Sequence, residues 1–329
     1  MNAFGPVGVD GAVRVSGRLG AMHTLTKAVL ATGLAGAGAL AYGSLIERNA
    51  FTLRRFVVPV LPRGSEPVDV LHLSDIHLMP TQRRKLAWIS ALAELEPDAV
   101  VNTGDNIAHP ESITPLIDAL APFRGLPGAF VLGSNDYFAP GRKNPADYLL
   151  RKKAKPRTPR LPTDVLVGEL VDSGWSDLTN TRGRMAVKGL DLELVGVDDP
   201  HLEYDRYDEV AGPADPTADL TVGIVHAPYT RVLDAMTADG AGLVIAGHTH
   251  GGQLAVPFYG ALVTNCDLDT GRVKGLSRWW PGANGIPSNE APTDAAWMHV
   301  SAGLGTSPYA PIRFACRPEA TLLTLTPRA

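Results

Sequence analysis

The sequence predicts an α/β domain that follows a membrane-spanning helix. Three observations lead to this prediction. Short β-rich runs recur along the chain with helical stretches between them, polar residues follow several of these runs, and residues 28–46 contain no charge. Strands that alternate with helices are typical of a sheet covered by helices, and roughly 20 apolar residues suffice to cross a bilayer as a helix.

Composition and charge exclude several classes of protein. The 329 residues are enough for a core that needs no disulfides or metals to fold. Hydrophobic residues make up 45% of the chain and charged residues 19%, which excludes wholesale disorder. The net charge of -4 gives no overall attraction to nucleic acid, so we consider that partner unlikely. Two cysteines are too few for a disulfide framework.

The uncharged segment 28–46 predicts a single-pass anchor in the cell membrane. A buried Ala-rich helix or a cleaved signal has a similar composition, but this segment lies outside the α/β domain and no Ala-x-Ala site directly follows it. Basic residues flank it on both sides, which leaves open the side of the membrane that carries the domain. We divide the chain into a tail (1–27), the transmembrane anchor (28–46), a linker (47–66) and the α/β domain (67–329).

The β-rich runs predict the elements of the domain in chain order. The first run is 68–73 and the second is 99–102, and between them residues 82–95 place Leu86, Ile89, Leu92 and Leu95 on one face of a helix. Together they form a strand-helix-strand unit. Further strands are expected at 129–132, 192–197, 220–225 and 243–246.

Two segments interrupt the alternation and are expected to be long loops. Residues 141–162 are rich in basic residues and proline, and residues 271–293 carry basic residues among glycines and prolines. A solvated surface is the commoner explanation for such charge runs. The alternative is that they flank the active site or touch anionic lipid, because Trp279 and Trp280 in the second segment are residues that favour the membrane interface.

Polar side chains gather where five of the expected strands end. The residues of interest are Asp75, His77, Asp105, Asn135, Asp136, His226, His248 and His250. Because the carboxyl ends of parallel strands lie at one edge of an open α/β sheet, we expect these side chains to converge. Oxygen and imidazole ligands together suit Mn, Fe or Zn, whereas calcium is bound by oxygen alone.

The number of candidate ligands exceeds what one ion needs. We therefore predict two divalent metal ions that share a bridging carboxylate. Such ions, about 3.5–4 Å apart, generate a hydroxide at neutral pH and hold the oxygens of a phosphoryl group during in-line displacement.

These motifs, taken in order, resemble the calcineurin-like metallophosphoesterase superfamily over residues 68 to about 327. Residues 247–253, together with 301–305 and 311–314, look like its bacterial membrane-associated branch. The resemblance implies a four-layer αββα sandwich, in which two mixed β-sheets pack face to face between helices. It also points to a metal-dependent phosphoesterase, and our leading hypothesis is that this enzyme hydrolyses a phosphodiester or pyrophosphate bond.

The resemblance assigns roles to the ligands. By similarity, Asp75, His77 and His250 hold one metal, while His226 and His248 hold the other together with an Asn. Asp105 bridges the two metals.

The third motif departs from the family pattern, which is Gly-Asn-His followed by Asp or Glu. There the Asn is a ligand and the His is the expected proton donor to the leaving group; here the residues are Gly133-Ser134-Asn135-Asp136. A gapless match puts Ser134 at the ligand position and Asn135 at the acid position. A shift of one residue makes Asn135 the ligand and places Asp136 beside the leaving group.

We favour the shift, because an amide oxygen is a better ligand for a borderline cation than a neutral hydroxyl. Asp136 is then the catalytic candidate, since a carboxyl with a raised pKa can carry a proton. The usual His donor is missing in either register. We therefore expect slow turnover or a leaving group that needs little protonation.

The remaining expectations concern substrate and support. Asn106 and His109 follow the expected bridging Asp105 and are predicted to contact substrate, a phosphate-containing small molecule or lipid, with a cell-envelope intermediate as one candidate. His72 is expected in the core or behind a ligand, while His201 and His299 have no partner recognisable from sequence. A competing hypothesis is a membrane protein that binds a phosphate ligand or partner at a retained metal site with little turnover.

Overall fold

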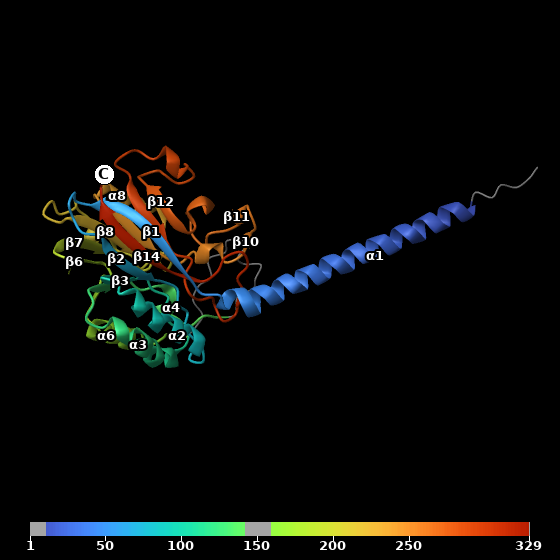
Figure 1. Ribbon diagram of the computed structural model, residues 1–329, viewed down its shortest axis with the longest axis horizontal. Helices are drawn as coiled ribbons and strands as arrows, with labels where there is room; N and C mark the ends of the chain where they lie inside the picture. The colour runs from blue at the N-terminus through green and yellow to red at the C-terminus, as the bar shows by residue number, and fades with distance from the viewer. Residues whose placement is uncertain (1–10, 142–158, 329) are drawn as a thin grey trace, which may run out of the picture.

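The computed structural model describes residues 11–141 and 159–328, with side chains from residue 26 onward. In this part of the chain two six-stranded sheets form the centre of the domain (Figure 1). The first sheet has the order β1 (Thr52–Leu61), β14 (Glu319–Pro327), β2 (Val68–Leu73), β3 (Ala99–Asn102), β4 (Gly128–Phe130) and β5 (Trp175–Asp177). The second has the order β12 (Gly275–Trp279), β13 (Ala296–Val300), β9 (Leu243–Ala246), β8 (Leu220–Val225), β7 (Leu190–Gly196) and β6 (Thr181–Val187).

Both sheets are mixed. In the first sheet β14 runs antiparallel to β2, whereas β2, β3, β4 and β5 are parallel neighbours. In the second sheet β7, β8, β9 and β13 are parallel, and the antiparallel strands β6 and β12 close the two edges. The carboxyl ends of β2, β3 and β4 therefore meet at one edge of their sheet, as do those of β8 and β9.

The helices and short strands complete the described elements. The α-helices are α1 (Gly11–Ala41), α2 (Arg83–Ala91), α3 (Ile113–Leu120), α4 (Ser134–Tyr137), α6 (Thr163–Asp172), α7 (Tyr207–Val210) and α8 (Thr230–Ala238), and β10 (Ala255–Val256) pairs with β11 (Gly260–Ala261). A π-helical turn covers Tyr42–Ile46, and 3-10 turns cover Glu47–Asn49, Leu92–Leu95, Pro110–Ser112, Ala121–Phe123, His250–Gly252, Thr270–Arg272 and Ser288–Glu290.

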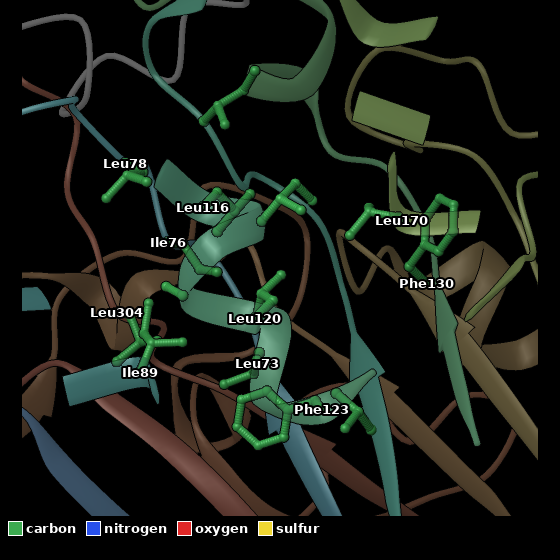
Figure 2. Packing of buried hydrophobic residues seen from close by; sticks show 14 of the residues in the cluster. Leu73, Ile76, Leu78, Ile89, Leu116, Leu120, Phe123, Phe130, Leu170 and Leu304 are labelled. Carbon is green, nitrogen blue, oxygen red and sulfur yellow. The ribbon is translucent and has the colours of Figure 1, made fainter. Parts of the chain in front are cut away.

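Three hydrophobic clusters define the layers. The cluster between the sheets joins buried Val70 and Val101 of the first sheet to Val222 and Ile245 of the second. A second cluster packs α2, α3 and α6 on the outer face of the first sheet (Figure 2). A third packs α8, through residues such as Leu233, on the outer face of the second sheet. The four-layer αββα sandwich is thus confirmed.

Most of the expected elements are present with small changes at their ends. The strands expected at 68–73, 99–102, 220–225 and 243–246 have those bounds. The strand expected at 129–132 is β4, at 128–130, and the one expected at 192–197 is β7, at 190–196. The helix expected over 82–95 is α2 followed by a 3-10 turn.

The stretch 47–66 is not a linker throughout, because Thr52–Leu61 form β1. This strand pairs in parallel with β14, and its side chains Val58, Val60 and Leu61 are buried between the sheets. Pro59 is compatible with a strand here because β1 lies at the edge of the sheet, where one side of the backbone needs no partner.

The two segments expected to be long loops are 141–162 and 271–293. Residues 271–293 contain the strand β12, so that segment is not a single loop. Trp279 in it is fully buried and donates through Nε1 to Asp234 (3.0 Å), while the Arg272 guanidinium lies 5.4 Å from the Trp279 ring. Trp279 is therefore a core residue and not an interfacial one. Of the other segment, residues 142–158 lie outside the described part of the chain.

Helix α1 projects away from the domain (Figure 1). Residues 11–27, expected to belong to a tail, are part of this helix, and residues 1–10 lie outside the described part of the chain. Thr26–Asn49 is long and apolar enough to cross a membrane by length and composition, and only 6% of its most apolar 18 residues are buried. The helix meets the domain at Gly43, whose carbonyl accepts a hydrogen bond from the Arg313 N–H (3.2 Å).

The role of β1 can be tested with two fragments that both lack α1. Fragment 47–329 keeps β1 and fragment 67–329 loses it. Burial of Val58, Val60 and Leu61 contributes roughly 1.5–3 kcal/mol each, which together approaches the total stability of a typical domain. We expect fragment 47–329 to unfold cooperatively in urea, followed by circular dichroism. Fragment 67–329 should lose about 5 kcal/mol or fail to fold, and equal unfolding midpoints would show that β1 is dispensable.

Candidate metal centre

The expected ligands converge between the two sheets. Asp75 and His77 follow β2, Asp105 follows β3, Asn135 follows β4, His226 follows β8, and His248 and His250 follow β9. Ion-pair and hydrogen-bond distances link all seven side chains into one cluster. The first sheet thus supplies four of them and the second sheet three.

One group of ligands surrounds a single point. Asp75, His77, Asp105 and His250 are all buried, and one ligand atom from each lies within 4.8 Å of the others. His77 Nε2 is 3.2 Å from His250 Nε2 and 3.3 Å from Asp105 Oδ2, and His250 Nε2 is 3.6 Å from Asp75 Oδ1. Atoms that share one ion at bond lengths of about 2.0–2.2 Å lie at such separations.

A second group adjoins the first through Asp105. His226 Nε2 is 3.2 Å from His248 Nδ1 and 3.6 Å from Asp105 Oδ1. Asn135 contacts both oxygens of Asp105, because its backbone N–H donates to Oδ1 (2.7 Å) and its side-chain N–H donates to Oδ2 (2.8 Å). The two oxygens of Asp105 therefore face different histidines, Oδ2 toward His77 and Oδ1 toward His226, as a bridging carboxylate requires.

The chemistry of these donors fits divalent cations. In each facing histidine pair two ring nitrogens point at one another, and such a pair can share only one proton. Two carboxylates are buried beside them, which is costly unless positive charge is present. Cations bound between the imidazoles and carboxylates would satisfy both sets of lone pairs.

Burial sets the protonation of most of the imidazoles. It lowers the pKa of His77 to about 4 and the pKa values of His248 and His250 well below the usual range. These three side chains are consequently neutral near pH 7, the form that binds metals. Burial also opposes charge on His226, but the carboxylates of Asp105, Asp199 and Asp75 raise its pKa to about 9.

The two aspartates respond in opposite directions. Burial raises the pKa of Asp75 to about 6, although the His226 charge opposes this. Burial acts in the same direction on Asp105, but the charges of His226 and His77 outweigh it and lower the pKa of Asp105 below its usual range. Asp105 is thus the carboxylate whose ionised form the site stabilises most.

The backbone at the ligands is strained. Asp75, His77, Asp105, His248 and His250 all have positive φ, between 42° and 68°. Residues other than glycine adopt this left-handed conformation at a cost of order 1–3 kcal/mol each, and it persists where the surrounding structure imposes it. The fold therefore holds these ligands in conformations that the isolated loops would not favour.

Gly133 allows the two sheets to approach each other at the centre. A Cβ atom at this position would collide with Asp105 Oδ1 and with the ring of His226. The chain after β4 can therefore lie against Asp105 and His226 only because residue 133 has no side chain.

Hydrogen bonds behind the ligands fix their orientation. The His226 Nδ1 lies 2.6 Å from the Thr103 carbonyl, to which it donates, and this turns Nε2 toward the centre. The Ser74 hydroxyl donates to Asp75, the Thr103 hydroxyl donates to Ser74 (2.7 Å), and His72 Nε2 lies 2.8 Å from the Thr103 hydroxyl. His72 thus supports the ligands from the core.

His299 extends this buried network. Its Nδ1 is 3.1 Å from His72 Nδ1, a contact that the sequence did not reveal. His299 lies on β13 and His72 lies on β2, so the network joins the two sheets beneath the ligands.

Asp136 is not placed to meet a leaving group. The side chain is fully buried, and its carboxylate accepts hydrogen bonds from the backbone N–H groups of Asp105 (2.8 Å), Asn106 (2.7 Å) and Gly133 (3.0 Å). Burial and the charge of Asp105 raise the pKa of Asp136 to about 7, whereas these donors favour the carboxylate. Its position indicates that Asp136 holds the loop that carries Asp105.

The two predicted substrate contacts also differ from expectation. Asn106 is fully buried, its Oδ1 accepts from Asn102 (2.7 Å) and its Nδ2 lies 3.4 Å from Asp136, so it is not available to a substrate. His109 is partly exposed and its Nδ1 accepts the N–H of Glu111 (3.2 Å) at the start of a 3-10 turn. A substrate contact of His109 stays a prediction.

Sequence reasoning missed three residues near the ligands. The His201 ring lies 4.6 Å from the His248 ring, and its Nδ1 is 3.1 Å from the Tyr229 hydroxyl. Asp199 is fully buried and accepts the N–H of His201 (2.9 Å). Both residues follow β7, so the rule of polar residues at strand ends, applied to that strand as well, would have found them.

Arg313 is the third missed residue. Its guanidinium is fully buried, lies 3.4 Å from His250 Nδ1, and donates to the carbonyls of Ala302 (2.7 Å) and Gly305 (2.7 Å). It lies in an irregular segment that no periodic pattern marks.

Comparison with known proteins identifies the class that this fold and centre define. Residues 68–252 match the family model of the calcineurin-like phosphoesterases. The chain belongs to this family, and it is a metal-dependent phosphoesterase.

Two relatives are similar over most of their length. The chain is 26% identical over 313 residues to the uncharacterized metallophosphoesterase YkuE of Bacillus subtilis, covering 88% of this chain and 94% of that protein. It is 27% identical over 269 residues to an uncharacterized metallophosphoesterase of Aquifex aeolicus, covering 80% and 87%. A transmembrane protein with metallophosphoesterase domain from Bos taurus is 25% identical over 206 residues, covering 60% of this chain and 44% of that protein.

The assignment of the third motif can be tested by a pair of substitutions. We expect Asn135→Ala to reduce bound manganese from about two ions to about one per chain, because it removes the side chain beside Asp105. Ser134→Ala serves as the matched control and should keep both ions. Metal content is measured by mass spectrometry after removal of free manganese, and loss of an ion from Ser134→Ala alone would establish the gapless register.

Proposed function

We propose that the chain is a single-pass protein of the cell membrane that hydrolyses a phosphodiester or pyrophosphate bond with two divalent metal ions. The observation that carries this proposal is the Asp105 carboxylate, whose two oxygens face two separate sets of histidines. Manganese, iron and zinc are the metals that suit this donor set.

The residues present define how such a centre would work. Asp75, His77 and His250 would hold one ion, His226, His248 and Asn135 the other, and Asp105 both. Bound there, the ions would supply a hydroxide nucleophile at neutral pH and stabilise charge on the phosphoryl oxygens. The chain's own contribution is to keep His77, His248 and His250 neutral by burial. It also directs His226 Nε2 at the centre through the hydrogen bond that Nδ1 donates to the Thr103 carbonyl.

The third motif bears on the leaving group. The Asp136 carboxyl points into the protein and binds backbone N–H groups there. The Asn135 side chain is an amide, which cannot transfer a proton to a leaving group as an imidazolium can. General acid help typically contributes about 10²- to 10⁴-fold. This supports a substrate whose leaving group needs little protonation, such as a pyrophosphate or nucleotide group.

The membrane assignment rests on the helix that ends at the domain. Thr26–Asn49 could span a bilayer, and one relative carries "transmembrane" in its name. A centre tethered in this way would meet substrates at the membrane, which favours a phosphate-bearing lipid or cell-envelope intermediate over a freely diffusing small molecule.

A second candidate function is binding of a phosphate ligand or partner with little turnover. The inward orientation of Asp136, together with Ser134-Asn135 in the third motif, favours it. The intact donor set around Asp105 favours the enzyme instead.

An assay of hydrolysis by the purified full chain in detergent distinguishes the enzyme from the binding protein. With manganese we expect turnover of bis-p-nitrophenyl phosphate, and Asp105→Asn should lower kcat/KM by at least about 100-fold, because even partners behind the ligands contribute roughly 10- to 100-fold. Glu193→Gln is the matched control: it alters a buried carboxylate, 2.7 Å from Arg182, that lies on β7. A folded, metal-loaded wild type without turnover of diester or pyrophosphate substrates would support the binding function.

A further inference from the structure

The β10–β11 hairpin carries an exposed apolar tip. The tip consists of Val256, Phe258, Tyr259 and Leu262; Phe258 is fully exposed, and Tyr259 and Leu262 are 78% and 56% exposed. Two aromatic and two aliphatic side chains within seven residues form a patch of the kind that marks a protein or membrane contact.

The hairpin and the end of the membrane helix are fastened to the same segment of chain. The Ala255 N–H donates to the Phe314 carbonyl (2.9 Å), at the start of the hairpin. The Arg313 N–H donates to the Gly43 carbonyl (3.2 Å), and the Tyr42 ring contacts the Phe314 ring edge-on at 6.3 Å. Figure 1 shows β10 and β11 close to the point where α1 meets the domain.

A basic cavity lies between the helix end and the hairpin. It has a volume of about 370 Å³, and Tyr42 and Pro257 line it from the two sides. Arg54, Lys274 and Arg317 also line it, and Arg54 pairs with Glu319 (3.3 Å).

One acidic side chain, Glu47, also lines this cavity. The Glu47 carboxylate accepts the backbone N–H groups of Ala315 (3.1 Å) and Cys316 (2.7 Å). Arg54, Lys274 and Arg317 outnumber the carboxylates of Glu47 and Glu319, so the cavity has an excess of positive charge that attracts the anionic headgroups of a bilayer surface.

We propose that the tip of the β10–β11 hairpin inserts into the bilayer beside α1, as a second membrane contact of the domain. The occupant of the apolar patch is lipid, because the hairpin is joined through Phe314 to Tyr42 at the end of the membrane helix, where Leu45 and Ile46 are themselves exposed and apolar. Tyrosine at the tip suits the level of the headgroups. The contact rests on α1 spanning the membrane, which is part of the proposed function, but does not depend on turnover.

This contact would hold the metal centre near the bilayer. Ala255 follows the ligand His250 by five residues, so the two can lie no more than about 18 Å apart. The intervening Gln253 fixes this segment by donating to the carbonyls of Ala310 (2.8 Å) and Ile312 (2.9 Å).

A fluorescent label sensitive to polarity tests the contact in the full chain. With Cys266 and Cys316 replaced by Ser, single cysteines are introduced by Phe258→Cys, Leu34→Cys and Val171→Cys, labelled with a nitrobenzoxadiazole dye and reconstituted into vesicles of phosphatidylcholine and phosphatidylglycerol. Val171 is the matched control, an exposed apolar residue of α6, which Figure 1 shows away from the base of α1. Leu34 reports on α1 itself.

We expect the labels at 258 and 34 to shift to shorter wavelength and to be quenched by spin-labelled lipid, while the label at 171 stays in water. Quenching at 34 without quenching at 258 would overturn the second contact and leave the anchor intact. A label at 34 that stays in water would overturn both. A shift at 258 that appears only at high protein-to-lipid ratio would mean that a second copy of the chain covers the tip, and would also overturn the proposal.

Discussion

The Asp105 carboxylate, buried between His77 and His226, is the feature on which the centre depends. Its oxygens lie 3.3 Å and 3.6 Å from imidazoles that come from different sheets. A carboxylate in that position is stable only if positive charge or hydrogen-bond donors accompany it. Asn135 donates one hydrogen bond to each Asp105 oxygen, and Asp136 holds the Asp105 loop by accepting the backbone N–H of Asp105.

The packing of the two sheets is what makes this arrangement possible. The hydrophobic cluster between them fixes the distance between the ends of β3 and β8, and Gly133 removes the side chain that would otherwise separate them. The same packing maintains left-handed backbone at five ligands. The buried network of His72, Thr103 and Ser74 carries the constraint from the core to Asp75.

The sequence was most informative where a strand ends in polar residues, because the sheet brings those ends together whatever the details of packing. The sequence was least informative about where a side chain points. Asp136 lies in the expected motif, but its carboxyl points into the protein, because backbone N–H groups bind it there. The strand β1 was predicted as a linker because Arg54, Arg55 and Pro59 interrupt its apolar residues. An edge strand tolerates such residues. The role of Arg313 depends on its contact with the ligand His250, which is distant in the sequence and which no local pattern encodes.

Diffraction from manganese-loaded crystals, collected at the manganese absorption edge, tests the central claim most directly. We expect two anomalous peaks about 3.5–4 Å apart, one on each side of the Asp105 carboxylate. A single peak, or two peaks of which neither adjoins Asp105, would contradict the bridging role on which the account of this centre rests.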